Sequence, residues 1–83
     1  MGNSVGDAGA RALAESLDIN NHLQFLGLEN NDIKEDGAIA LAAVFDRNQT
    51  LDWLALEENL LKPKQKARLA ERYAGRSNIH LTL

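Results

Sequence analysis

The stretch LQFLGLENNDI, residues 23–33, decides the fold, because it recurs 28 positions later as LDWLALEENLL, residues 51–61. Every apolar position of the first copy is apolar in the second. Within each copy the last two leucines alternate with residues of other kinds, as in a short β-strand that buries one face. We therefore predict a strand at the start of each copy.

A helical pattern follows the strand at the same offset. Ala38, Leu41, Ala42 and Phe45 are spaced i, i+3, i+4 and i+7, which is the inner stripe of an amphipathic helix. Residues 9–17 carry the same stripe ahead of the first strand. Self-similarity at a period between about 20 and 50 residues is typical of repeat proteins, whose units bury their apolar faces against their neighbours. Each unit is predicted to contain one strand and one helix.

This repeat divides the 83 residues into four parts of a single domain. We expect a first unit without a strand at 1–22, a complete unit at 23–50, a unit with an atypical capping helix at 51–77, and a terminal strand at 78–83. Because the chain begins partway through a unit, we expect a C-terminal fragment of a longer array. The strand within residues 23–28 would then have an open edge, to which another strand could add.

The pattern Leu-x-x-Leu-x-Leu-x-x-Asn-x-Ile, followed by Gly-Ala-x-x-Leu-Ala, resembles the leucine-rich repeats of the ribonuclease-inhibitor-like class. The resemblance covers nearly the whole chain, and it implies an α/β solenoid, a right-handed horseshoe with parallel strands on the concave face and helices on the convex face. It also implies that Asn3, Asn31 and Asn59 form a ladder in which side-chain amides satisfy buried backbone groups. Proteins with this repeat share a strand-lined binding surface, so the resemblance implies function only as a category.

The resemblance places the residues that flank the middle leucine of each strand on the concave face. Phe25, Trp53 and His80 should then form a lateral row of rings across strands about 4.8 Å apart, bordered by acidic residues. The candidate partner-binding residues are Phe25, Glu29, Trp53, Glu57, Glu58 and His80. Aromatic residues are enriched at interface hot spots, and the carboxylates favour a protein partner with a basic surface. The alternative is that the rings only cover one another as a cross-strand stack.

Charge is divided unevenly along the chain. Residues 1–61 contain 3 basic and 11 acidic side chains, whereas residues 62–83 contain 6 basic and 1 acidic. The basic end could attract nucleic-acid phosphates or an acidic membrane. No aromatic residue is interleaved with its cations, so we favour a solvated capping helix and expect neither nucleic acid nor a membrane as partner.

Catalytic and cofactor chemistry is not indicated. The sequence has no cysteine, and its two histidines, His22 and His80, lie on different parts of the repeat without metal-ligand spacing. It contains no phosphate loop, dinucleotide fingerprint or nucleophile elbow. We predict a protein-interaction scaffold that is not an enzyme, has no cofactor or metal, and is cytoplasmic, as the lack of cysteine suggests. Two alternatives stay open: a regulator of an enzyme, as inhibitor or GTPase activator, and self-association through the open strand edge.

Overall fold

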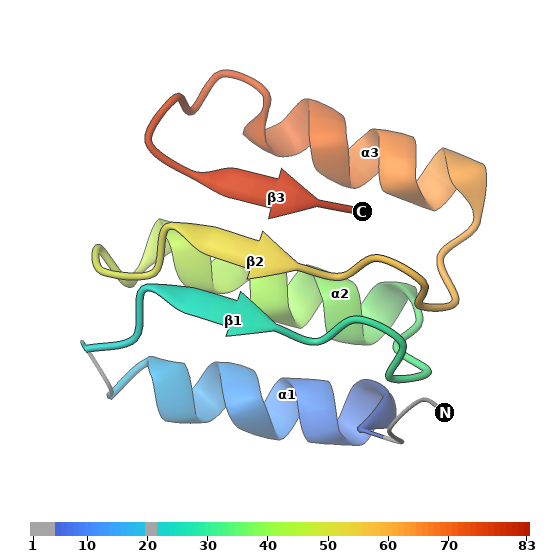
Figure 1. Ribbon diagram of the computed structural model, residues 1–83, viewed down its shortest axis with the longest axis horizontal. Coiled ribbons are helices and arrows are strands. Elements are labelled where there is room, and N and C mark those ends of the chain that lie inside the picture. Colours follow the sequence, from blue (N-terminus) through green and yellow to red (C-terminus); the bar gives the residue numbers. More distant parts are fainter. Residues whose placement is uncertain (1–4, 20–21) are drawn as a thin grey trace.

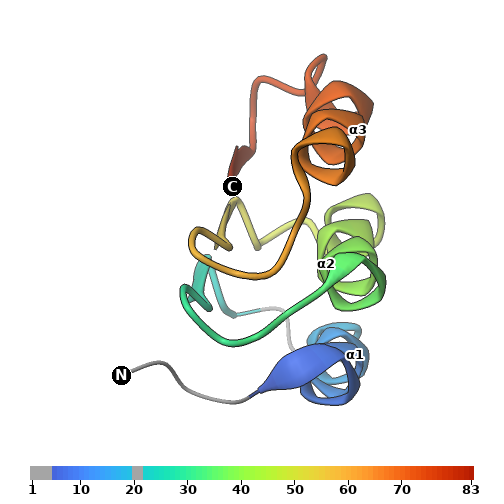
Figure 2. The ribbon, with the colours of Figure 1, turned by 90° about the vertical axis from the view of Figure 1, so that its right-hand side faces the viewer.

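The computed structural model of the protein describes residues 5–19 and 22–83. Helices and strands alternate along these residues: α1 (Gly6–Leu17), β1 (Phe25–Gly27), α2 (Glu35–Ala42), the 3-10 helix η1 (Ala43–Asp46), β2 (Trp53–Ala55), α3 (Pro63–Tyr73) and β3 (His80–Thr82). The strands form one layer and the helices lie together on one side of it (Figures 1 and 2). None of the helices described is long and apolar enough to span a membrane.

The sheet is parallel, with strand order β1-β2-β3. Its register follows the sequence repeat, since Phe25 lies opposite Trp53 and Trp53 lies opposite His80. Each strand has only three residues and is shorter than predicted. After β1 and β2 the chain turns at two equivalent residues with left-handed backbone, Asn30 (φ 58°) and Glu58 (φ 60°). A left-handed residue does not continue a strand, so neither strand extends past these turns.

The core lies between the sheet and the helices. Leu28, Leu54 and Leu56 contribute to it from the strand layer, and the predicted inner stripe of the second helix, residues 38–45, is confirmed by the burial of its apolar residues. That stripe continues past the end of α2 into η1, which carries Phe45. The helical periodicity therefore identified the buried face correctly, although it did not show the change to a 3-10 helix.

The helices α1 and α2 approach each other closely at Gly37. A Cβ atom on this glycine would lie 2.6 Å from Asp7 Oδ1 and 3.0 Å from Ala10 Cβ. Asp7 Oδ1 also accepts a hydrogen bond of 2.7 Å from the N–H of Lys34, the residue before α2. The absence of a side chain at position 37 is therefore what lets α1 hold the start of α2.

The third helix, α3, starts differently from α2. It begins at Pro63, and the N–H of Lys62 donates a 2.9 Å hydrogen bond to Gln65 Oε1, an arrangement that satisfies backbone groups at a helix start. At the positions that correspond to Gly37 and Ala38 it carries Gln65 and Lys66. A groove of about 520 Å³ remains between α2 and α3.

The predicted α/β class is confirmed, but the predicted solenoid is not. Three parallel strands with one layer of three helices make a small two-layer unit (Figure 2). The curvature of a horseshoe accumulates from a small rotation at each of many repeats. The described residues contain only two steps from strand to strand, so no horseshoe is present in them.

Candidate functional site

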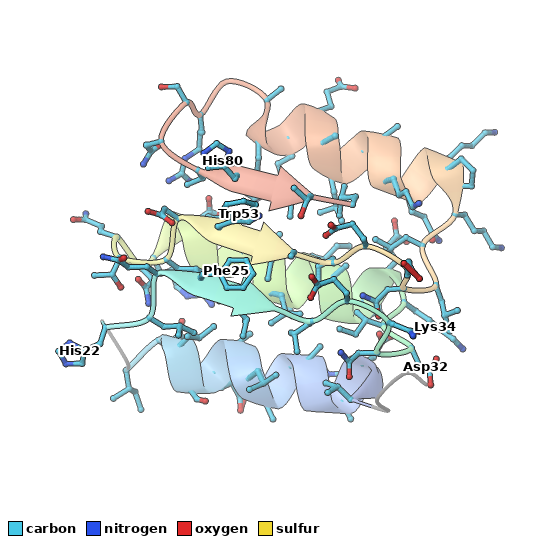
Figure 3. The ribbon with its side chains drawn as sticks, in the orientation of Figure 1. His22, Phe25, Asp32, Lys34, Trp53 and His80 are labelled. Carbon is cyan, nitrogen blue, oxygen red and sulfur yellow. The ribbon has the colours of Figure 1, made fainter. Side chains whose placement is uncertain are left out.

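The candidate site is the side of the sheet that faces away from the helices, which we call the strand face. It is formed by the residues of β1, β2 and β3 that alternate with the inward-pointing leucines, namely Phe25, Gly27, Trp53, Ala55, His80 and Thr82. Leu26, Leu54 and Leu81 point the other way, into the core. Figure 3 shows Phe25, Trp53 and His80 one above another across the three strands.

The predicted row of rings is present on the strand face. The ring centroids of Phe25 and Trp53 are 5.4 Å apart with an edge-to-face angle of 89°, and those of Trp53 and His80 are also 5.4 Å apart, tilted by 47°. Edge-to-face pairs contribute about 0.5–1.5 kcal/mol beyond the area that they bury. The rings nevertheless stay accessible, since Phe25 is 49% and Trp53 43% exposed. The stack fixes the rings without covering them.

Two carboxylates border this row. Glu57, just after β2, has its Oε1 2.7 Å from the hydroxyl of Thr82, which donates a hydrogen bond to it. This bond, together with backbone hydrogen bonds, lowers the pKa of Glu57 below its ordinary value. Glu29 occupies the equivalent place after β1 and is exposed. Glu58 differs from both, because it lies in the left-handed turn that follows, outside the strand.

The glycine of β1, Gly27, is a feature of the site that sequence reasoning missed. A Cβ atom there would lie 2.9 Å from Glu29 Oε1 and 3.1 Å from Cε2 of the Phe25 ring. The carboxylate and the edge of the ring therefore meet over this glycine. The signal was visible in the sequence, since Gly27 and Ala55 put small residues between a ring and a carboxylate in both strands.

Asparagine side chains hold the turns behind the carboxylates. Asn59 Oδ1 accepts hydrogen bonds from the N–H groups of Asn31 (2.8 Å) and Ile33 (3.0 Å), and its Nδ2 donates to the carbonyl of Leu28 (2.8 Å). Asn31 Nδ2 donates to the carbonyl of Glu29 at 3.0 Å, while its buried Oδ1 has no partner among the described residues. Asn3, the predicted third member of the ladder, lies outside the described residues.

A second buried asparagine, Asn48, supports the entry into β2. Its Oδ1 accepts hydrogen bonds from the N–H groups of Thr50 (2.8 Å) and Leu51 (3.0 Å), and its Nδ2 donates to the carbonyl of Leu17 at 2.9 Å. It thus ties the end of α1 to the loop before Trp53. The sequence repeat did not indicate that its amide would be buried.

The remaining histidine, His22, lies before β1 and away from the ring row (Figure 3). Within residues 5–19 and 22–83, no three His, Asp or Glu side chains are grouped so that they could hold a metal ion. The site is accordingly a surface of rings, small residues and carboxylates.

Comparison with known proteins gives a likeness of fold. No protein-family model matches the chain, and no curated protein matches it. Solved structures do match, and one of them is described as leiomodin-1 actin-binding site 2. It is 22% identical in sequence, has a TM-score of 0.74, and is aligned over 93% of this chain and 46% of its own. The chain thus spans about half the length of that structure.

These findings correct the assignment to the ribonuclease-inhibitor-like leucine-rich repeats. No family model supports it, the matched structure is described as an actin-binding site, and three strands with three helices are not a solenoid. The assignment was wrong because a 28-residue offset and its apolar pattern specify a strand, a helix and a register, and these do not define a family. The offset remains a property of this chain.

Proposed function

We propose that the chain is a non-catalytic protein-binding module that holds its partner against the strand face. One observation carries this proposal: Phe25 and Trp53 remain 49% and 43% exposed on a side of the sheet that the helices leave uncovered. Rigid aromatic side chains lose little conformational freedom when a partner covers them, and interface hot spots are enriched in tryptophan and tyrosine. A partner that covers both rings would bury them at little entropic cost.

The acidic border of the ring row favours a partner with a basic surface. Glu29 and Glu57 follow the strands that carry the two exposed rings. Charges placed in this way increase the rate of encounter and exclude partners of the wrong charge, more than they raise affinity. The chain's excess of acidic residues before position 62 acts in the same direction.

Actin is the first defined partner to assay. The support is the fold likeness to a structure described as a leiomodin actin-binding site, which extends over 93% of this chain. We propose co-sedimentation with actin filaments, together with a binding assay on monomeric actin, because the likeness does not distinguish the two forms.

The general proposal is tested by capture of partners from cell extract with three matched baits. These are the wild-type chain, the double variant Phe25→Ser with Trp53→Ser, and the control variant Ile39→Ser. Ile39 is 48% exposed and lies on α2, in the helix layer. Circular dichroism first establishes that all three are folded. We expect a partner that the wild type and Ile39→Ser retain and the double variant loses. Equal capture by all three baits would refute a binding role of the strand face.

The identity of a captured partner also bears on the two alternatives. If the partner is an enzyme, its rate with and without the chain tests a regulatory role. Self-association is favoured by the edge of β1 that no described strand pairs with. Light scattering at high micromolar concentration separates it from the main proposal, since a monomer rules it out.

A further inference from the structure

The strand face has three rows of different chemistry that run across the strands. The first is the ring row of Phe25, Trp53 and His80, and the second contains the small residues Gly27, Ala55 and Thr82. The third row is acidic, with Glu29 and Glu57. Successive residues on one side of a strand are about 7 Å apart, so the rings of Phe25 and Trp53 are each separated from a carboxylate by one small residue.

The carboxylate of Glu57 is held in a fixed orientation. Thr82, from the neighbouring strand, donates the 2.7 Å hydrogen bond to its Oε1. Glu57 itself is only partly buried, so the carboxylate stays within reach of a ligand. A carboxylate that is already oriented loses less freedom on binding than a mobile one.

At Gly27 an aromatic ring and a carboxylate come together. The Phe25 ring and Glu29 Oε1 approach the same point above the glycine, 3.1 Å and 2.9 Å from the place of its missing Cβ. A ring and a carboxylate are thus both close to this point, and these are the two kinds of group that attract a cation.

The two carboxylates also stand apart from the ion pairs of the described residues. The arginines of the chain form their ion pairs elsewhere, on the helix side, with Asp18, Glu35 and Asp46. Among the described residues neither Glu29 nor Glu57 takes part in an ion pair, and the hydroxyl that bonds Glu57 is neutral. The strand face therefore combines half-exposed rings with negative charge that no described residue neutralises in an ion pair.

We infer that the strand face binds an arginine side chain of the protein partner, with the guanidinium against the Phe25 and Trp53 rings and hydrogen-bonded to Glu29 and Glu57. The inference rests on the proposed function and names the chemistry of its partner. A guanidinium is planar, stacks on aromatic rings and presents a fork of donors to carboxylates, whereas a lysine ammonium is a compact point charge that is more strongly hydrated. Arginine is thus favoured over lysine on this face.

The chain has its own reporter for this interaction, because Trp53 is its only tryptophan. The experiment follows tryptophan fluorescence while three capped tripeptides are added separately: Gly-Arg-Gly, Gly-Lys-Gly and Gly-citrulline-Gly. Citrulline has nearly the shape of arginine without its charge. We expect saturable binding of the arginine peptide in the millimolar range, binding of the lysine peptide that is about threefold or more weaker, and no saturable binding of the citrulline peptide.

Two carboxylate variants locate the binding. Glu57→Gln keeps an oxygen for the Thr82 hydrogen bond but removes the charge, and it should weaken binding of the arginine peptide about tenfold, the effect of losing one charge-assisted hydrogen bond. Glu15→Gln removes a charge from α1, on the helix side, and should leave that binding unchanged. Equal binding of arginine and citrulline peptides would overturn the inference, and so would a Glu57→Gln variant that binds like the wild type or a wild type that shows no saturable change.

The arginine site and the proposed function can be refuted independently of each other. A protein partner that depends on the rings, combined with no response to the arginine peptide, would refute only the arginine site. Arginine binding that Glu57→Gln abolishes, combined with baits that capture the same proteins, would support the site and refute the role of the strand face in holding a partner.

Discussion

The junction between α1 and α2 and the junction between α2 and α3 are built from equivalent positions of the repeat but differ in how closely the helices pack. At the first junction Gly37 lets the α1 residues Asp7 and Ala10 approach to within van der Waals contact. At the second junction the equivalent position is Gln65, and a groove of about 520 Å³ separates the helices. Gly37 thus allows closer packing of neighbouring helices than Gln65 does at the equivalent position.

The polar links across the two junctions differ in the same way. In the first, the short amide of Asn48 donates to the carbonyl of Leu17 at 2.9 Å and is buried. In the second, the equivalent carbonyl, that of Phe45, accepts a 3.1 Å hydrogen bond from the long, partly exposed side chain of Arg76. Ion pairs between exposed side chains, such as Arg68 with Glu35 at 2.8 Å, complete the second junction. Exposed bonds link the helices at both junctions, and the first junction also has the buried link of Asn48, so the first should contribute more to stability.

The largest expected effect on stability comes from replacing the hydrogen-bond donors Asn48 and Arg76, which occupy equivalent positions, one at a time. Asn48→Ala should lower the free energy of unfolding by about 2–3 kcal/mol, because it leaves the carbonyl of Leu17 and the N–H of Leu51 buried without partners. Arg76→Ala should cost about 1 kcal/mol or less, since its ion pair with Asp46 is exposed to water. Urea denaturation followed by circular dichroism measures both. Equal losses in the two variants would mean that the junctions are energetically alike.

A smaller effect is expected from adding a side chain at Gly37, where α1 and α2 pack closely. Gly37→Ala should destabilise the chain by about 1–2 kcal/mol, because the new Cβ atom meets the backbone of Asp7 at 3.0 Å and overpacking exceeds the gain in helix propensity. Gly75→Ala is the matched control, since nothing lies within 4 Å of a Cβ atom at that position. The control should change stability by no more than about 0.5 kcal/mol. Tolerance of both substitutions would argue against close packing of α1 on α2.

The sequence allowed some of these features to be predicted and not others. The strands, the inner helical stripe and the lateral row of Phe25, Trp53 and His80 all follow from periods of 2, 3.6 and 28 residues, which are geometric properties that a single chain displays. The use of Gly27 was missed although its neighbours Phe25 and Glu29 are only two residues away, whereas the burial of Asn48 depends on which atoms from another unit lie nearby. The local sequence contains no such information.

The α2–α3 groove and the family assignment illustrate two further limits of prediction from the sequence. The substitution of Gln65 and Lys66 for Gly and Ala is visible in the sequence, but whether α3 then moves away or repacks is decided by tertiary contacts such as that of Tyr73 with Phe45. The family assignment failed for another reason, since the same apolar periods describe the geometry of a strand and a helix wherever they occur.

Filling the groove should produce an effect of opposite sign to that of Gly37→Ala. Ala43 lines the groove beside Ile39 and Leu69, so Ala43→Leu adds apolar atoms where there is room for them. We expect unchanged stability or a gain of up to about 1 kcal/mol, measured by the same urea denaturation. A loss comparable to that of Gly37→Ala would show that α2 and α3 pack as closely as α1 and α2 do.

The smallest expected effect concerns the link between the last two units on the strand face. Thr82→Val removes the hydroxyl that donates to Glu57 Oε1, the leading cause of the lowered pKa of that carboxyl, so the pKa should rise toward its ordinary value. A carboxyl whose pKa is lower in the folded chain stabilises it above the unfolded pKa, and this stabilisation is lost as the pH falls through the folded pKa. The variant should therefore lose less stability than the wild type over that acidic range. An NMR titration of the Glu57 side chain measures the shift directly, with Thr50→Val as the matched control, because the hydroxyl of Thr50 bonds Asn48 instead. An unchanged Glu57 titration in Thr82→Val would mean that backbone hydrogen bonds, and not the neighbouring strand, orient this carboxylate.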